Sequence, residues 1–387
     1  MQHHRPALRK RFSTASMHLI VPAAAALASA CQTPAMETPV QETVAAPTQI
    51  TPRKADDSGQ VSATENASNR SAKSRVKITT APGSSSTRDN SALIATPTPL
   101  KIERIRRTGT ISSPELTEIS GMSASISVPG ALFVINDSAN SPTLYALNEQ
   151  GQLLASWPIV AENRDWEDMA RFSIADRNYL LVGDTGDNLQ LRNCSVLHFV
   201  HEPSLIDDTA KLHPATSLNI CYSDGPRNVE AFTVIDDDLY LLSKEAPSGS
   251  SRNPSGIYRV NLPSDAQQLY NTAELPAIKV GEMPLRNTGI EGALAAAVAG
   301  VDLSQPTSMD FDPVSNSVYI LTYREVLRVK RHSESSWADA FSAPAELVMS
   351  HSLSQAEALT VSPGRAVWFT SENAQAPIWA IPLAPPL

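Results

Sequence analysis

The stretch Asp165-Trp166-Glu167-Asp168-Met169 begins one of five similar units in this chain. Each unit has a small or acidic residue, an apolar run, a turn, and a second apolar run that ends in polar residues. The units begin at Leu116-Thr117-Glu118-Ile119-Ser120, Asp165-Trp166-Glu167-Asp168-Met169, Asn228-Val229-Glu230-Ala231-Phe232, Pro306-Thr307-Ser308-Met309-Asp310 and Gln355-Ala356-Glu357-Ala358-Leu359. Because each interval can hold four short strands, the repetition predicts a β-propeller.

Short apolar runs between turn-forming residues predict an all-β domain over residues 101–387. The clearest runs are Ala131–Ile135, Thr143–Leu147, Tyr179–Val182, Ser195–Val200, Asp238–Leu242, Ile257–Val260, Val318–Thr322, Val326–Lys330, Ala366–Thr370 and Ile378–Ile381. One helical insert is expected at Glu291–Val301. Only three strands follow Gln355, so Lys101–Ile111 should supply the fourth. We therefore predict five four-stranded blades closed by an N-terminal strand, with six blades as the alternative if residues 265–305 hold a divergent blade.

Residues 1–30 are typical of an export signal. The basic run Arg9-Lys10-Arg11 precedes an apolar run that is too short to span a bilayer. The following Leu27-Ala28-Ser29-Ala30-Cys31 resembles the lipobox of bacterial lipoproteins, in which the cysteine is diacylated and becomes the mature N-terminus. An ordinary secretory signal is the alternative. Because Gln32 rather than Asp follows Cys31, we expect an outer-membrane lipoprotein, with the propeller in the periplasm or at the cell surface.

The charge of the chain is divided unevenly along its length. Residues 31–100 are rich in Ser, Thr and Pro and have no aromatic residue, so we expect a disordered tether there. Residues 1–100 hold eleven of the 31 basic and six of the 40 acidic residues, which leaves 20 basic and 34 acidic residues in the domain. A net charge of −14 disfavours nucleic acid as a partner. The expected partners are the membrane, through Cys31, and an envelope ligand or protein. We expect a monomer.

The five repeated units place acidic residues around one axis. The first strand of each propeller blade lines the central channel, so the residues near its start converge. They are Glu118, Glu167, Glu230, Ser308 and Glu357. Four converging carboxylates would repel one another unless a cation were bound. Oxygen ligands in a flexible ring suit calcium better than zinc, so the pattern predicts an axial calcium site.

Polar residues at the ends of the second strands should gather at the same mouth of the channel. The candidate catalytic carboxylates are Asp137 and Asp187. The other residues expected on this substrate face are Asn136, Asp184, Asn188, Lys244, Arg324 and Glu372. The alternative is that these residues are ordinary turn formers.

Two cysteines remain once Cys31 is assigned to the lipid anchor. Cys194 and Cys221 form no CxxC motif, and an even number in an oxidising compartment predicts one disulfide.

Some of these motifs resemble those of known protein families. Asn136-Asp137-Ser138, Asp165-Trp166-Glu167-Asp168 and Gly183-Asp184 with Gly186-Asp187-Asn188 resemble phrases of bacterial secreted β-propeller proteins without an established function. The order Glu, Glu, Glu, Ser, Glu over five blades is similar to the calcium-activated nucleotidases (apyrases). That similarity implies one axial Ca²⁺ and hydrolysis of nucleoside diphosphates. The anchors also resemble, more loosely, the esterase-like phytase propellers.

Two functions and one limiting case follow from these patterns. The first is a lipid-anchored, calcium-stabilised propeller that serves as a binding module in the cell envelope. The alternative is a calcium-dependent hydrolase of phosphoesters or phosphoanhydrides, in which the metal orients water and substrate and Asp137 or Asp187 acts as base. In the limiting case the calcium is purely structural. Ser138 and Lys244-Glu245 stand where the nucleotidases carry arginines, which weakens the hydrolase alternative.

Overall fold

A computed structural model describes residues 105–205, 214–245, 254–299 and 301–383. The predicted export signal, Cys31 and the predicted tether lie outside these described residues. Within the described part of the chain, no helix is long and apolar enough to cross a membrane.

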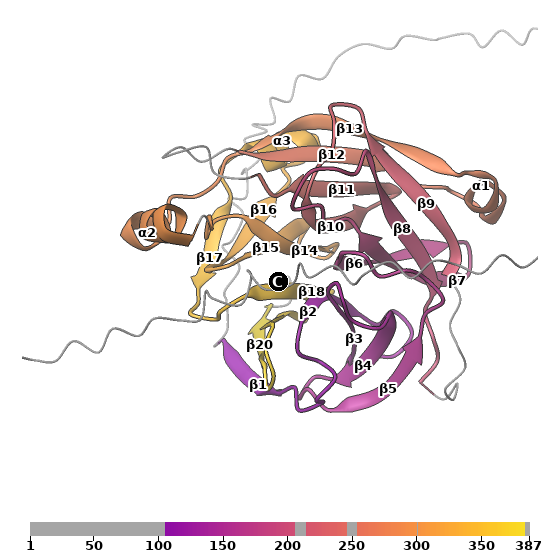
Figure 1. Ribbon diagram of the computed structural model, residues 1–387, viewed down its shortest axis with the longest axis horizontal. Coiled ribbons are helices and arrows are strands. Elements are labelled where there is room, and N and C mark those ends of the chain that lie inside the picture. Colours follow the sequence, from indigo (N-terminus) through magenta and orange to yellow (C-terminus); the bar gives the residue numbers. More distant parts are fainter. Residues whose placement is uncertain (1–104, 206–213, 246–253, 300, 384–387) are drawn as a thin grey trace, which may run out of the picture. The chain divides into compact units, whose positions relative to one another are not determined.

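The strands form five antiparallel sets of four, arranged around a centre (Figure 1). Blade 1 contains β2 (Ile119–Ala124), β3 (Ala131–Asn136), β4 (Thr143–Asn148) and β5 (Leu153–Pro158). Blade 2 contains β6 (Trp166–Ile174), β7 (Arg177–Asp184), β8 (Cys194–His201) and β9 (Pro214–Tyr222). Blade 3 contains β10 (Val229–Ile235), β11 (Asp238–Ser243), β12 (Ser255–Asn261) and β13 (Glu274–Met283). Blade 4 contains β14 (Pro306–Asp312), β15 (Ser317–Thr322), β16 (Glu325–Lys330) and β17 (Glu346–Ser350). Blade 5 contains β18 (Ala356–Ser362), β19 (Ala366–Ser371), β20 (Pro377–Pro382) and β1 (Arg106–Thr110). The predicted all-β propeller is confirmed.

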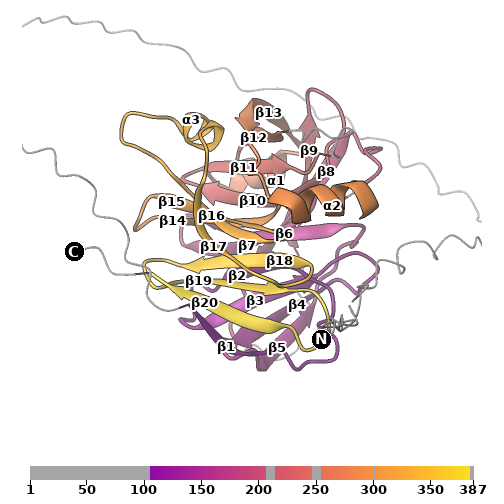
Figure 2. The ribbon, with the colours of Figure 1, turned by 90° about the vertical axis from the view of Figure 1, so that its left-hand side faces the viewer.

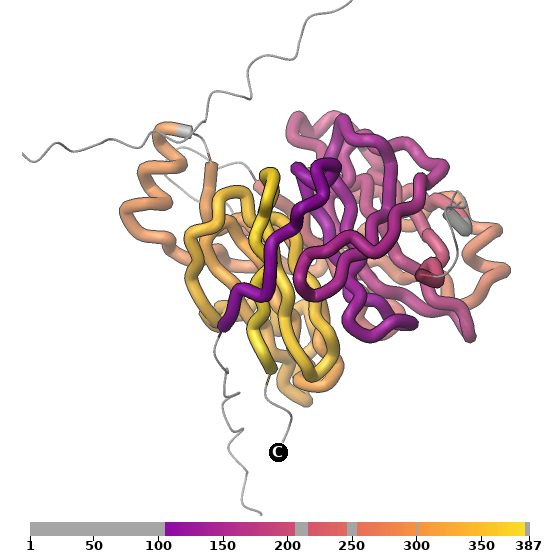
Figure 3. Tube along the Cα trace, turned by 90° about the horizontal axis from the view of Figure 1, so that it is seen from below, coloured from indigo at the N-terminus to yellow at the C-terminus, as the bar shows by residue number. Residues whose placement is uncertain are grey.

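An N-terminal strand closes the ring, as predicted. β1 pairs antiparallel with β20 and so completes the last blade. Figure 2 shows β18, β19, β20 and β1 side by side, and Figure 3 shows the indigo β1 along the yellow C-terminal strands. Gly109 of β1 lies against the β4–β5 turn, where a Cβ atom would stand 2.0 Å from the carbonyl oxygen of Gln150. The closing strand therefore also contacts blade 1.

Residues 265–305 contain no additional blade in their described part, so the six-bladed alternative is wrong. They form α1 (Ala266–Asn271), β13 and α2 (Gly289–Ala299), the helix expected at Glu291–Val301. The third helix, α3 (Trp337–Ser342), begins with a capping box at Ser336 and lies in blade 4 between β16 and β17.

Two neighbouring blades share an edge. The outer strands β9 and β13 pair in parallel, with Glu274 opposite Asn219 and Ala277 opposite Tyr222. Blades 2 and 3 thereby form one eight-stranded sheet. The predicted disulfide between Cys194 and Cys221 is present and joins β8 to β9 beside this shared edge.

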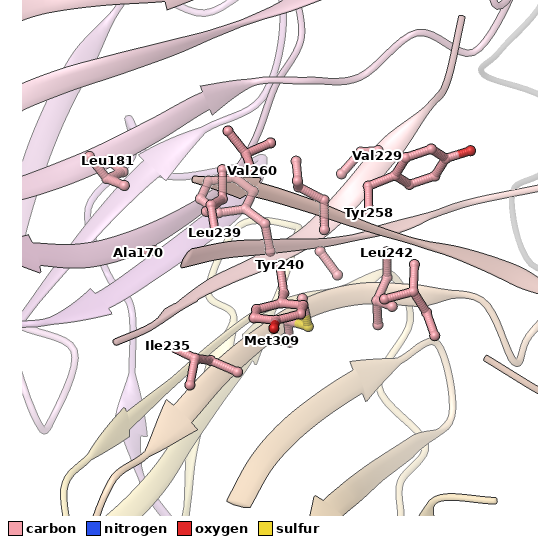
Figure 4. Close-up of a cluster of buried hydrophobic side chains, with 14 of the residues drawn as sticks. Ala170, Leu181, Val229, Ile235, Leu239, Tyr240, Leu242, Tyr258, Val260 and Met309 are labelled. Atoms are coloured by element: carbon pink, nitrogen blue, oxygen red, sulfur yellow. The ribbon is translucent and has the colours of Figure 1, made fainter. Parts of the chain in front are cut away.

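The hydrophobic core lies between neighbouring sheets. Each sheet has apolar residues on both faces, so the middle strands β3 and β19 are buried at every position. Figure 4 shows part of the largest cluster, in which Leu181 of blade 2, Leu239 of blade 3 and Met309 of blade 4 are buried. This packing holds the starts of the five inner strands at fixed positions around the axis.

Candidate functional site

Every inner strand has a β-bulge near its first residue, and the bulges define the equivalent positions around the axis. These positions hold Ser120, Glu167, Glu230, Thr307 and Glu357. Glu118 and Ser308 are therefore not the equivalent residues of blades 1 and 4, which corrects the predicted ring. The hydroxyl groups of Ser120 and Thr307 instead donate to backbone carbonyls of the next blade, Trp166 O at 2.8 Å and Ala356 O at 2.7 Å.

The inner strands begin at the end of the ring that we call the mouth. In an antiparallel blade, the connection between the second and third strands opens at this same end. The loops after β3, β7, β11, β15 and β19 therefore surround the bulge positions. This arrangement brings Asp137 next to Glu167, although the two residues belong to different blades.

Three carboxylates at the mouth form what we call the acidic trio, Asp137, Asp165 and Glu167. One oxygen from each lies within 4.8 Å of the others. Glu167 is only 6% exposed, and no donor among the described residues forms a hydrogen bond with its carboxylate. Burial, together with the charges of Glu230 and Asp137, raises the pKa of Glu167 well above its usual value.

The pKa values of the other two members of the trio, Asp165 and Asp137, are also raised. Burial and the charge of Asp137 raise the pKa of Asp165 to about 6. Burial likewise raises the pKa of Asp137, although the backbone N–H of Ser138 opposes the shift. Without a bound cation, the trio is thus a group of carboxylates that resist ionisation.

Asn163 and Gly186 border the trio on two sides. The Asn163 side chain donates to the carbonyl of Asp137 at 2.9 Å and accepts from the N–H of Trp166 at 3.2 Å. It therefore joins the loop after β3 to the start of β6. Gly186 leaves room on the other side, because a Cβ atom there would lie 2.2 Å from Glu167 Oε1 and 2.5 Å from Asp165 Oδ2.

Lys244 occupies the blade 3 side of the ring. Its Nζ lies 2.5 and 2.6 Å from the two oxygens of Glu230 and 2.7 Å from Tyr323 Oη. Burial lowers the pKa of Lys244, but the charges of Glu230 and Glu357 outweigh this effect and hold the pKa well above its usual value. Glu230 is thus neutralised by a residue of the chain itself.

On the blade 5 side, Glu357 lies close to Glu372. Burial and the charge of Glu372 raise the pKa of Glu357 well above its usual value. Burial also raises the pKa of Glu372, which interacts with Asp137 and Glu118. Glu118 itself precedes β2 and accepts from Asn140 at 2.6 Å.

The loop after β7 is held by its own contacts. The two carboxylate oxygens of Asp187 accept from the backbone N–H groups of Leu191 and Arg192 at 3.0 and 2.7 Å. Asp184 pairs with Arg192 at 2.5 Å. Asn188 accepts from Asn228. Asp187 therefore stabilises the loop through both carboxylate oxygens, and its role as a base stays a prediction.

Two other predicted substrate-face residues are also engaged. Arg324 donates to Leu353 O at 2.9 Å and to Glu291 Oε1 of α2 at 2.8 Å. Asn136 is buried and donates to Glu115 O at 2.6 Å. Both residues lie at the mouth, but neither reaches the acidic trio.

Below the trio, two further carboxylates link the blades along the axis. Asp168 accepts from the backbone N–H of Phe232 at 3.0 Å and of Met309 at 3.1 Å, and from Ser308 Oγ at 2.9 Å. Asp310 accepts from Thr360 Oγ1 and the N–H of Val361, both at 2.8 Å, and pairs with Arg171 at 3.0 Å. The channel beneath the mouth is thus crossed by hydrogen bonds.

Sequence reasoning did not assign a role to Asp165, Asp168 or Asp310. The first two lie in the Asp165–Asp168 motif, where three acids within four residues were a usable signal. Asp310 carried no such signal.

Comparisons with known proteins name no family for this chain. No family model and no curated sequence matches the chain. Among solved structures, the PQQ-bound aldose sugar dehydrogenase of Streptomyces coelicolor is 11% identical and covers 74% of this chain and 99% of its own, with a TM-score of 0.39. A glucose dehydrogenase is 10% identical and covers 72% of this chain and 99% of its own, with a TM-score of 0.39.

Proposed function

We propose that this protein is a lipid-anchored β-propeller of the cell envelope that binds calcium at its mouth and serves as a binding module. The observation that carries the proposal is the Glu167 carboxylate, which is buried, lacks a hydrogen bond among the described residues, and points at Asp137 and Asp165. A buried carboxylate without a partner is costly unless it is protonated or bound to a cation.

The donor set favours a hard divalent cation. The acidic trio offers oxygen atoms only, and Ca²⁺ accepts six to eight oxygens in flexible geometry. Because Lys244 already neutralises Glu230, the ion would be held by the trio on the blade 1 and blade 2 side rather than by the whole predicted ring. Gly186 places no side chain of its own against Glu167 and Asp165.

The contacts at the mouth favour binding over phosphate hydrolysis. Lys244 and Arg324 of the predicted substrate face, together with Arg192, are engaged by carboxylates of the chain. A substrate phosphate would therefore have to displace an existing ion pair. Asp137, one of the two candidates for a base, belongs to the proposed calcium ligands. Inorganic phosphate released from nucleotides or phytate by the calcium-loaded protein would favour the hydrolase alternative instead.

Membrane attachment is part of the proposal and rests on the sequence around Cys31. The lipobox-like residues 27–31 follow an apolar run, and the sequence of residues 32–100 suits a spacer between the anchor and the propeller. Calcium bound at the mouth would stabilise the folded ring by preferential binding to that state.

The test is calcium titration of the purified protein and of its Glu167→Gln variant. We expect calorimetry to detect one Ca²⁺ site, with at least tenfold lower affinity in Glu167→Gln. In EDTA the same variant should melt at a higher temperature than the parent, because the amide removes the repulsion within the trio. A variant that simply misfolds would melt lower in both conditions.

Glu346→Gln is the matched control, because Glu346 is an exposed carboxylate that pairs with Arg328 far from the mouth. Its calcium affinity should equal that of the parent. If Ca²⁺ changes neither the heat of titration nor the melting temperature of the parent protein, the calcium site is refuted.

A further inference from the structure

Helix α2 exposes an apolar surface that packing within the ring does not explain. Ile290 is 89% exposed, Leu294 62% and Val298 78%. These residues follow the spacing i, i+4, i+8, so they form one stripe along the helix. Ala293 and Ala297 are exposed beside them. The face of a helix that normally packs onto a core is here turned outward.

The composition of α2 leaves almost nothing polar to oppose burial of this stripe. Apart from glycine, the helix contains only Ile, Leu, Val and Ala, with the single charged residue Glu291. The Glu291 carboxylate pairs with Arg324 at 2.8 Å. The only charge on the helix is therefore already compensated by the ring.

Helix α2 lies at the mouth end of the ring. The helix lies in the connection between β13 and β14, which opens at the mouth because β14 begins there. Arg324, in the loop after β15, holds α2 and also donates to Leu353 O in the connection between blades 4 and 5. Figures 1 and 3 show α2 projecting from the ring beyond the sheets.

We propose that α2 docks onto the hydrocarbon boundary of a lipid bilayer and turns the mouth of the propeller toward the membrane. The proposal rests on the membrane attachment given under the proposed function. At 1.5 Å per residue, the eleven residues of α2 are about 16 Å long, against about 30 Å for a bilayer core. The helix can therefore lie in the interface but not cross it.

Chain length makes this contact favourable. The 74 residues between Cys31 and β1 span at most about 250 Å when fully extended. A lipid on Cys31 would confine the domain to a thin layer beside the bilayer, and this high effective concentration would add to the contact that the stripe makes by itself. The acidic charge of the domain disfavours anionic lipids, so the expected surface is zwitterionic.

A second copy of the chain is a poorer occupant of the same stripe. Stable protein interfaces bury about 800 Å² per partner. A helix about 16 Å long and about 10 Å wide offers only a few hundred Å². A bilayer sets no such minimum, because each inserted side chain contributes separately.

The test places one environment-sensitive fluorophore on the helix. In the chain with Cys31→Ser, the dye is attached at Leu294→Cys and, as a matched control, at Tyr270→Cys of α1, which is 54% exposed. With phosphatidylcholine–phosphatidylethanolamine vesicles, we expect a blue shift and quenching by spin-labelled lipids at position 294 but not at position 270. Equal responses at both positions, or none at position 294, would overturn the proposal. So would a change at position 294 that depends on protein concentration without vesicles, because that outcome indicates self-association.

A second variant tests the stripe without a dye. Leu294→Glu in the Cys31→Ser chain should lower co-flotation with the same vesicles at least fivefold, while Ca²⁺ affinity stays unchanged. Unaltered flotation would contradict docking through α2. Because Glu167→Gln should lose Ca²⁺ but keep α2, the two variants separate failure of the docking surface from failure of the calcium site.

Discussion

Asp168 joins three blades through one buried carboxylate. Its oxygens accept from Met169 within blade 2, from Phe232 of blade 3, and from Met309 and Ser308 of blade 4. Burial raises the pKa of this carboxyl group well above its usual value, against four hydrogen bonds that favour the charged form. The inner strands are thus tied together at the axis by a group that a hydrophobic residue could not replace.

Removing this carboxylate should destabilise the ring strongly. Asp168→Ala leaves the backbone N–H groups of Phe232 and Met309 buried without acceptors, and each such group costs about 1–3 kcal/mol. We expect urea denaturation to show a loss of about 3 kcal/mol. The exposed Glu346→Ala should change stability by less than about 1 kcal/mol. A comparable small change in Asp168→Ala would show that water replaces the carboxylate.

The sequence predicted which residue types meet at the mouth, but not their individual contacts. Glu167, Glu230 and Glu357 occupy equivalent bulges, as the repeated units indicated. Ser120 and Thr307 were missed because a hydroxyl group at a strand start has no distinctive sequence signature. Lys244 follows β11 and reaches Glu230 of the paired strand β10 in the same blade, and the sequence pattern alone does not show that these two side chains meet.

At the scale of elements, apolar runs located the middle strands of every blade. All ten runs coincide with second and third strands, which are largely buried. The outer strands β5, β13 and β17 have mostly exposed or half-buried positions and so give a weak signal. Pairing of β9 with β13 was not predicted, because it depends on the relative placement of two blades.

Closure of the ring depends on the fit of β1 against blade 1. Gly109→Ala would place a Cβ atom 2.0 Å from the carbonyl oxygen of Gln150, so β1 or the β4–β5 turn must move. Such overpacking costs about 1–3 kcal/mol, and we expect thermal unfolding to show that loss. The exposed Arg106→Ala in the same strand should have little effect. If the two variants have the same melting temperature, the contact of β1 with blade 1 does not contribute to stability.

At the scale of the whole molecule, the acidic trio should make stability depend on pH in the absence of metal. Burial raises the pKa of Asp165 from 3.8 to about 6, so the folded state binds this proton more tightly than the unfolded chain. The resulting stabilisation is fully present below about pH 4 and is lost as pH rises through about 6. In EDTA, the melting temperature should therefore fall between pH 5 and 7.

Calcium should reverse this trend, because ion binding requires the charged carboxylates. We expect differential scanning calorimetry to show the fall in EDTA but not with Ca²⁺. The Asp165→Asn variant should show a shallower fall in EDTA. An identical pH dependence in parent and variant would mean that Asp165 does not titrate in this range.

The shared edge of blades 2 and 3 also bears on how the protein avoids aggregation. The outer strand of a propeller blade presents unpaired N–H and C=O groups that can recruit a strand from another molecule. Between Asn219 and Tyr222, and between Glu274 and Ala277, these groups are consumed by the partner blade. Along this part of its rim the ring therefore offers no template for β-sheet growth from one molecule to the next.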